Sequence, residues 1–440
     1  MKKKYLYRFT FVAALGGFLF GFDTAVINGA IPFFTDHFNL SDAMKGWAVS
    51  AALIGCVVGA LLVGKPGDYF GRRLVLRFLA LLFLVSAVGT AFAWDFRSFI
   101  FFRLIGGLAI GGSSVLSPLY ISEIAPAAHR GKLAITFQLA IVIGILTAFF
   151  SDYLLLDTGE HNWRWMFLVE ALPAGIFFGL LFAVNQSPRW LVMKGYIQQA
   201  RTVLTRVNPD EDPDRLVAEI RESVNTEVLG KSIYLFRQPY LRLVVIGFLV
   251  GMFNQFTGIN IIMYYTTDIF REAGFSTGSA IGQTVIIGFT NLIFTLIAMR
   301  VIDRIGRKKM LLTGSLGMTL FLSLFGFAWL TQALGGIVLL VMLVGFVAFF
   351  AFSQGAVIWV LLSEMFPNVI RARGSSIGSF SHWGFNALTG FLFPTVAALF
   401  TDGKGIGYIF LFYAVVTLFS FFFFKKYLVE TKGKRLEEMG

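Results

Sequence analysis

Three ionisable side chains stand inside long apolar stretches of this chain. Asp23 lies near the middle of the first stretch, Arg103 near the start of the fourth, and Glu170 in the sixth. A lone charge at the centre of a bilayer costs about 2.5–3.5 kcal/mol even on insertion scales, so such residues pair or serve a function. Burial favours the neutral form of an acid, whereas a nearby guanidinium favours its charged form. The three residues therefore predict a proton switch, with a permanent ion pair that only holds helices together as the alternative.

A second group of side chains in these stretches is polar or aromatic but uncharged. Amides both donate and accept hydrogen bonds, as hydroxyl groups do, and aromatic faces suit the apolar C–H face of a sugar ring. Interhelical hydrogen bonding is the alternative for any single member. The group contains no carboxylate and no arginine, which argues against a charged substrate. Its members are Gln138, Asn254, Gln255, Asn260, Tyr264, Asn291, Trp359, His382, Trp383 and Asn386.

Two charged turns occur twice, once in each half of the chain. Residues 64–73 read GKPGDYFGRR and are echoed at 300–308 by RVIDRIGRK, while SEIAPAAHRG at 122–131 is echoed at 363–374 by SEMFPNVIRARG. Internal repeats of this kind are how many secondary transporters are built. We expect their charges to form ion pairs that break when the cytoplasmic side opens, with helix capping and topology marking as the alternative. The charged members are Asp68, Arg72, Arg73, Glu123 and Arg130 in the first half, and Asp303, Arg307, Glu364 and Arg371 in the second.

The elements that position these residues must be membrane helices. The chain is 57% hydrophobic, contains 51 Phe and is only 14% charged, which a soluble domain of this size could not bury. We predict an all-α membrane protein with twelve transmembrane helices in two pseudo-symmetric six-helix bundles. Gly258 should interrupt the seventh span, as happens where a helix breaks around a ligand. The expected spans are 9–33, 46–63, 74–94, 99–119, 133–155, 165–184, 241–268, 281–301, 310–330, 337–361, 376–400 and 406–424.

The only long polar stretch separates six spans from six. We therefore expect an N-terminal bundle at 1–184, a cytoplasmic helical linker at 185–240, and a C-terminal bundle with a short cytoplasmic tail at 241–440. Leu216, Ile220 and Val224 recur at every fourth position, which predicts an amphipathic helix over 214–228.

The net charge of +12 follows from membrane topology and does not require nucleic acid as a partner. With both termini inside, roughly 31 of the 37 Lys and Arg fall in cytoplasmic segments, which is the positive-inside pattern. We expect a multi-pass protein of the plasma membrane, most simply a bacterial inner membrane. Cys56 is the single cysteine, and no Cys/His cluster has metal-ligand spacing, so neither a metal nor a cofactor is predicted.

Taken together, these residues resemble the sugar porter branch of the major facilitator superfamily over about residues 10–436. The charged turns alone indicate the superfamily. The more specific motifs are PLYISEIAPAAHRGK at 118–132, SPRWL at 187–191, NQFTGIN at 254–260, WVLLSEMFP at 359–367 and VETKG at 429–433.

The resemblance implies two bundles that alternate access around a central sugar. Proton-coupled members of the family carry an acid in span 1 and an arginine in span 4, which are Asp23 and Arg103 here, whereas facilitative animal carriers lack that acid. The family's sugar contacts fall on Phe20, Gln138, Gln255, Asn260, Tyr264, Asn291, Trp359, Trp383 and Asn386; we add their neighbours Asn254, Gly355 and His382 to the expected binding site.

The chain also departs from the family pattern. Asn254 stands where the family usually has the first of two Gln, and His382 where Gln or Asn is common. Ala356 replaces a Pro, Gln186 a Glu, and Val429 a Pro. Two of these departures touch the expected pocket, so the identity of the sugar does not carry over from the family.

We therefore predict a proton-coupled symporter of a neutral monosaccharide, a pentose or hexose such as xylose, glucose or galactose, that works as a monomer in the lipid bilayer. Asp23 would carry the proton, Arg103 would be its partner, and Glu170 would assist. A facilitative sugar uniporter of the same fold, a polyol or inositol symporter and a membrane sugar sensor remain alternatives. An enzyme is not expected, since no nucleophile–base set or metal cluster lies at a plausible depth.

Overall fold

The protein is described here by a computed structural model that covers residues 4–126, 130–230, 234–332, 336–367, 370–430 and 432, and it is helical almost throughout. The first half contains α1 (Lys4–Phe38), α2 (Asp42–Leu62), α3 (Gly64–Phe70), α4 (Arg72–Ala91), α5 (Phe96–Ile124), α6 (Arg130–Leu155), α7 (Asn162–Leu168) and α8 (Ala171–Leu180). The second half contains α12 (Tyr240–Gln255), α13 (Ile259–Glu272), α14 (Thr277–Ile305), α15 (Arg307–Leu330), α16 (Gly336–Phe352), α17 (Gln354–Glu364), α18 (Arg371–Ala398) and α19 (Gly405–Tyr427).

The predicted twelve-helix membrane fold is confirmed. Eleven helical stretches among the described residues are long and apolar enough to cross a membrane. The twelfth is α18, whose 28 residues are long enough but less apolar, because His382, Asn386 and several Ser and Gly lie on it. The short helix α3 was not expected as a separate element; it forms the turn between the second and third spans.

Three spans are broken within the described part of the chain, and each break lies beside a predicted site residue. Gly258 has a φ of +81°, a left-handed conformation that suits glycine, and it separates α12 from α13 as predicted. Ser353 separates α16 from α17 just before Gly355, with φ −119° and ψ −93°. Glu170 lies at the junction of α7 and α8. Such breaks turn polar backbone and side chains toward the interior of a bundle.

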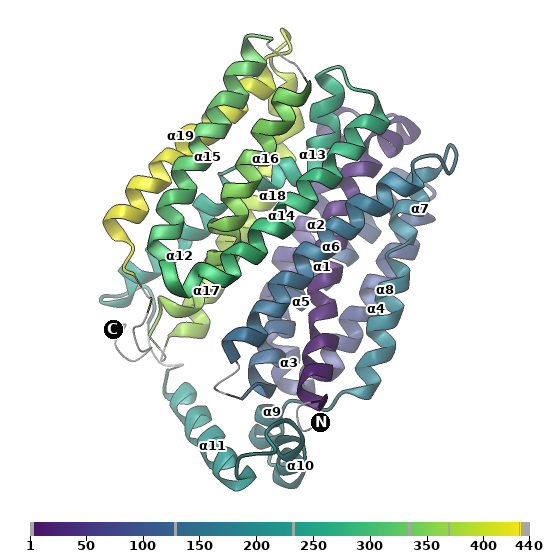
Figure 1. Ribbon diagram of the computed structural model, residues 1–440. Helices are drawn as coiled ribbons and strands as arrows, with labels where there is room; N and C mark the ends of the chain where they lie inside the picture. The colour runs from purple at the N-terminus through teal and green to yellow at the C-terminus, as the bar shows by residue number, and fades with distance from the viewer. Residues whose placement is uncertain are drawn as a thin grey trace.

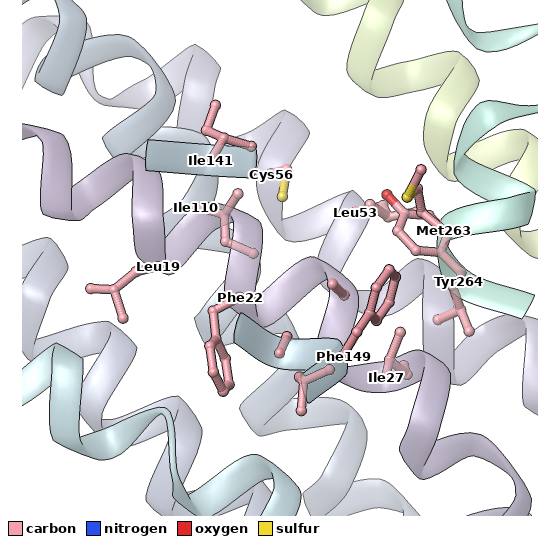
Figure 2. Packing of buried hydrophobic residues seen from close by; sticks show 14 of the residues in the cluster. Leu19, Phe22, Ile27, Leu53, Cys56, Ile110, Ile141, Phe149, Met263 and Tyr264 are labelled. Atoms are coloured by element: carbon pink, nitrogen blue, oxygen red, sulfur yellow. The ribbon is translucent and has the colours of Figure 1, made fainter. Parts of the chain in front are cut away.

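Glycines let the helices at the centre of the first half approach closely. A Cβ on Gly21 of α1 would collide with the carbonyl of Ile141 on α6, and one on Gly144 of α6 would collide with the carbonyl of Phe18 on α1. Small residues at helix contacts are the usual means of close packing in membranes. Around them, buried side chains of α1, α2, α5, α6 and α13 form one apolar cluster, part of which is shown in Figure 2.

Three short helices lie at one end of the bundle: α9 (Pro188–Met193), α10 (Ile197–Val207) and α11 (Pro213–Gly230). The helix predicted over 214–228 is confirmed as α11. Figure 1 shows these helices beneath the bundle, at the end where α1 begins and toward which α19 runs. We call this the near end and the opposite one the far end.

The two halves touch each other mainly toward the far end. There α2 packs on α18 so closely that a Cβ on Gly46 would collide with the carbonyl of Phe391. The helices α6 and α14 also meet, and a Cβ on Gly288 would lie 3.1 Å from side-chain atoms of Leu146 and Phe149. The far end is therefore closed in this conformation.

Candidate functional site

Asp23 and Arg103, the two residues predicted as partners, form a buried ion pair between α1 and α5. Their residues are 0% and 2% exposed. Arg103 Nη1 donates to Asp23 Oδ1, and Arg103 Nη2 donates to the Asp23 carbonyl oxygen over 3.4 Å. Asp23 Oδ2 and Arg103 Nε have no hydrogen-bond partner. The pair is thus only partly satisfied, which leaves room for it to bind a proton or exchange partners.

Glu170 lies beside this pair in the same half. It is 1% exposed, its Oε1 has no hydrogen-bond partner, and it lies within electrostatic range of both Asp23 and Arg103. The Arg103 guanidinium lies 5.4 Å from the ring centroid of Phe167, one helical turn before Glu170. The structure therefore brings together the three charges that the sequence analysis selected.

A chain of hydrogen-bonded amides runs through the second half. Gln255 Nε2 donates to Asn254 Oδ1 over 2.9 Å and lies 2.8 Å from His382 Nδ1. Asn260 Nδ2 donates to Gln255 Oε1 over 2.5 Å, and Asn254 Nδ2 donates to Gln354 Oε1 over 3.3 Å. These side chains come from α12, α13, α17 and α18, so the breaks at Gly258 and Ser353 place them within reach of one another.

A polar pair and an aromatic pair lie on the same helices. Asn386 Nδ2 donates to the Tyr264 hydroxyl oxygen over 3.1 Å, which joins α18 to α13. The ring centroids of Phe20 and Trp383 are 5.2 Å apart, and this contact joins α1 of the first half to α18 of the second. Both pairs were predicted as sugar contacts.

The remaining predicted pocket residues are more dispersed. The rings of Trp359 and His382 are 4.9 Å apart. Gly355 follows Gln354 at the start of α17. Gln138 on α6 has a buried Oε1 without a partner, and Asn291 on α14 is 7% exposed. Neither of the last two is hydrogen-bonded to the amide chain within the part of the protein that the structure describes.

The repeated turns form matching clusters at the near end. Arg72 lies 2.9 Å from both Asp68 and Glu123, measured between guanidinium nitrogens and carboxylate oxygens. Arg307 binds Asp303 over 2.9 Å and Glu364 over 3.0 Å in the same way. Each of these ion pairs lies within one half of the bundle.

Three predicted members of the gate need separate comment. The prediction of an ion pair at Arg73 is wrong for this conformation, because its guanidinium donates to the backbone carbonyls of Leu181 and Phe182, over 3.2 and 2.9 Å. Carbonyls at a helix end attract a cation as a carboxylate does. The side chains of Arg130 and Arg371 lie outside those that the structure describes.

Sequence reasoning missed the contacts that close the far end. Asn28 Nδ2 of α1 donates to the carbonyl of Met263 on α13 over 2.6 Å, and Asn28 Oδ1 accepts from the backbone N–H of Thr267 over 3.0 Å. Lys45 of α2 lies 3.3 Å from Asp268 of α13. Asn28 is an amide inside a predicted span, a signal of the kind used for the other amides.

Two further polar residues were also missed. Gln354 ends the amide chain and has a buried Nε2 without a partner. Asp152 is buried on α6. It lies three residues before the end of the span expected at 133–155, so the sequence does not reveal its burial.

Comparisons with known proteins identify the family of this chain. The family model described as "Sugar (and other) transporter" matches residues 9–440. The "Arabinose-proton symporter" of Bacillus subtilis is 39% identical, over 97% of this chain and 92% of the relative. The "D-xylose-proton symporter" of Escherichia coli K12 is 37% identical, over 99% and 95%. A partially occluded inward open structure of the E. coli xylose transporter XylE matches with a TM-score of 0.87 at 36% identity, over 98% of this chain and 99% of that one.

Proposed function

Because this chain belongs to the family of sugar (and other) transporters, which are carriers and not enzymes, we propose that it couples the import of a neutral monosaccharide to the entry of a proton. The observation that carries this proposal is the Asp23–Arg103 pair, an acid buried at mid-span and held by a guanidinium. A facilitator needs no titratable group at this depth, where a charge is costly.

The proton chemistry follows from the unpartnered atoms around the pair. A proton on Asp23 cancels its attraction for Arg103, and Glu170 then offers the guanidinium another carboxylate, since its Oε1 is unpartnered. Loss of the proton restores the original pair. A change of partner by Arg103 moves α5 against α1, which is how a proton could favour one conformation of the bundle over the other.

The sugar is proposed to bind along the amide chain of the second half. In this conformation Asn254, Gln255, Asn260 and His382 satisfy one another's hydrogen bonds. Hydroxyl groups can replace each of these contacts because they both donate and accept. Relatives are named for arabinose, D-xylose and glucose. A pentose or hexose is therefore the substrate class that we propose, with Phe20 and Trp383 against its apolar face.

We further propose the orientation and the gate. The near end, with α9–α11, the start of α1 and the end of α19, would face the cytoplasm of a bacterial cell, which places most Lys and Arg inside. The bundles would comprise residues 1–184 and 241–440, joined by 185–240, and act as a monomer. With the far end closed, the protein faces inward. The ion pairs around Arg72 and Arg307 are formed in this conformation, although we expected them to break when the cytoplasmic side opens. We therefore propose instead that they stabilise the near end of each half while contacts between the halves form and break.

Uptake into proteoliposomes tests the coupling. A proton crossing 100 mV supplies about 2.3 kcal/mol, enough for roughly 50-fold accumulation of a neutral sugar. Labelled D-xylose should therefore accumulate above its external concentration under an inward proton gradient. Asp23→Asn should abolish accumulation while exchange of labelled for unlabelled sugar continues. Asp36→Asn is the matched control, because Asp36 is an exposed acid on the same helix.

Two results would count against the proposal. Accumulation that survives in Asp23→Asn would remove Asp23 from coupling, and wild-type uptake that ignores external pH and uncouplers would identify a uniporter. Competition by a panel of pentoses, hexoses, polyols and inositol against labelled D-xylose would identify the preferred solute. Stronger competition by a polyol or inositol would replace the monosaccharide in the proposal.

A further inference from the structure

Asp152 of α6 is a fully buried acid that pairs with no charged side chain among those the structure describes. The residue is 0% exposed, and no described residue makes a hydrogen bond of normal geometry to Oδ1 or Oδ2, although the backbone of Gly29 lies close to the carboxyl group. It packs against the backbone of α1 at Gly29, where an added Cβ would lie 2.6 Å from both Asp152 Cβ and Asp152 Oδ2. One turn earlier on α6, Phe149 belongs to the same buried apolar cluster as Ile27 of α1 (Figure 2).

The helices packed against α6 are α1, α5, α7 and α14. On three of these helices, charged or titratable residues lie nearest to Asp152 along the membrane normal: Asp23, Asp36 and His37 on α1, Arg97 and Arg103 on α5, and Arg164 on α7. On α14 the charged residues are at the near end: Arg300, Asp303 and Arg304. Arg103 is engaged by Asp23, and Arg164 donates to the carbonyl of Ala91 over 2.6 Å. Within the described residues, none of these groups forms an ion pair or hydrogen bond with Asp152.

An ionised carboxylate in such a place would lack both water and a counter-ion. Burying an unpaired charge costs far more than burying a neutral polar group, so a carboxyl group in these surroundings binds a proton. We propose that Asp152 is a second proton-binding site of this transporter, separate from the Asp23–Arg103 pair, and that it holds a proton while the far end of the bundle is closed.

The position of Asp152 connects this proton to the far-end contacts. Its neighbour Gly29 directly follows Asn28, which binds the Met263 carbonyl and the Thr267 N–H of α13. A charged Asp152 draws water between α1 and α6 and displaces this part of α1. The closed far end therefore requires the protonated acid. As the external pH rises, closure becomes less favourable because the proton is harder to acquire.

Infrared spectroscopy of the purified full chain tests the proton directly, without sugar. The carbonyl stretch of neutral, water-shielded carboxyl groups should be present at neutral pH and should lose the contribution of Asp152 in Asp152→Asn. Asp157→Asn is the control, since Asp157 is an exposed acid just beyond α6. If Asp152→Asn does not fold, Asp152→Ser serves in its place with the same expectation. A band that is unchanged in the folded variant would overturn the proposal.

A transport measurement tests the connection to closure and rests on the proposed function. Wild-type sugar exchange should fall with rising pH by up to about tenfold per pH unit, the limit for one linked proton. Asp152→Asn, which mimics the protonated acid, should retain exchange at the higher pH, whereas Asp157→Asn should follow the wild type. Identical profiles for wild type and Asp152→Asn would refute the link to closure. A failure of proton coupling itself would appear separately, as wild-type uptake without accumulation, and would leave the infrared result standing.

Discussion

The charged turn at the near end of the first half and its copy in the second half bind alike but differ in exposure. Arg72 and Glu123 have side chains that are 5% and 3% exposed, whereas those of Arg307 and Glu364 are 12% and 22% exposed. The repeated sequence determines the partners in both turns, but the surrounding helices determine how much water reaches them. The corresponding ion pairs are therefore expected to contribute different amounts to the stability of the two halves.

The centres of the two halves differ more strongly. The first half holds Asp23, Arg103 and Glu170, and the second holds the uncharged amide chain around Gln255. The repeated turns are thus alike in the two halves, whereas the interiors differ: carboxylates and an arginine lie in the first half, and groups that match hydroxyls lie in the second. If the proposed function is correct, proton binding and sugar binding can be altered one at a time.

The largest effect is expected when the charge pair of the first half is broken. Arg103→Leu leaves Asp23 buried without its counter-ion, which should cost about 3–5 kcal/mol of stability and abolish uphill uptake. The double variant Asp23→Asn/Arg103→Leu should recover most of that stability but not the uptake. Thermal unfolding in detergent measures the first quantity. If Arg103→Leu is as stable as the double variant, Asp23 and Arg103 do not form a buried ion pair in solution.

A smaller and unequal effect is expected at the two turns. Arg72→Met should cost about 3 kcal/mol because the buried Glu123 loses its ion-pair partner, whereas Arg307→Met should cost about 1 kcal/mol because water reaches Glu364. Arg201→Met, which removes an exposed ion pair with Asp214, is the reference with almost no expected change. Equal losses at Arg72 and Arg307 would contradict the difference in exposure.

A change of selectivity, rather than of stability, is expected in the second half. His382→Gln replaces the ring beside Gln255 with an amide and should alter the ratio of pentose to hexose uptake by roughly tenfold, the worth of one hydrogen bond to substrate. The number of protons per sugar should stay the same. Competition assays with His37→Gln as a control measure the ratio. An altered proton number would mean that the two interiors are not independent.

The smallest effect is expected at the N-termini of α4 and α15, the helices that begin within the two charged turns. Gln186 Oε1 accepts from the N–H of Arg73 over 3.1 Å at the start of α4, while Glu430 accepts from the N–H groups of Arg307 and Lys308 over 2.9 and 3.0 Å at the start of α15. A negative charge near a helix N-terminus stabilises it by about 0.3–1 kcal/mol. Gln186→Glu should therefore raise the unfolding temperature slightly, and Glu430→Gln should lower it. Shifts of the opposite sign would exclude the dipole explanation.

Much of the proposed site could be inferred without coordinates. Asp23 and Arg103 stand out because each is a charge in an apolar run, and opposite charges at that depth can compensate each other. The amides around Gln255 stand out for the same reason. Arg73 was misjudged because an arginine in a charged turn can bind carbonyls as well as carboxylates, and only the position of the η2 turn at Leu181–Ala183 selects between them.

By itself, the sequence determined the membrane environment, the twelve spans, the repeated turns and the charges that need partners. These depend on the length and polarity of local segments, because each span must bury its backbone and side chains in hydrocarbon. The tertiary structure alone decided that the far end is closed by Asn28 and Lys45, that Gln354 joins the amide chain, and that no counter-ion among the described side chains pairs with Asp152. Those facts depend on which helices touch and at what height, and residues more than 200 positions apart must meet before burial or pairing is defined.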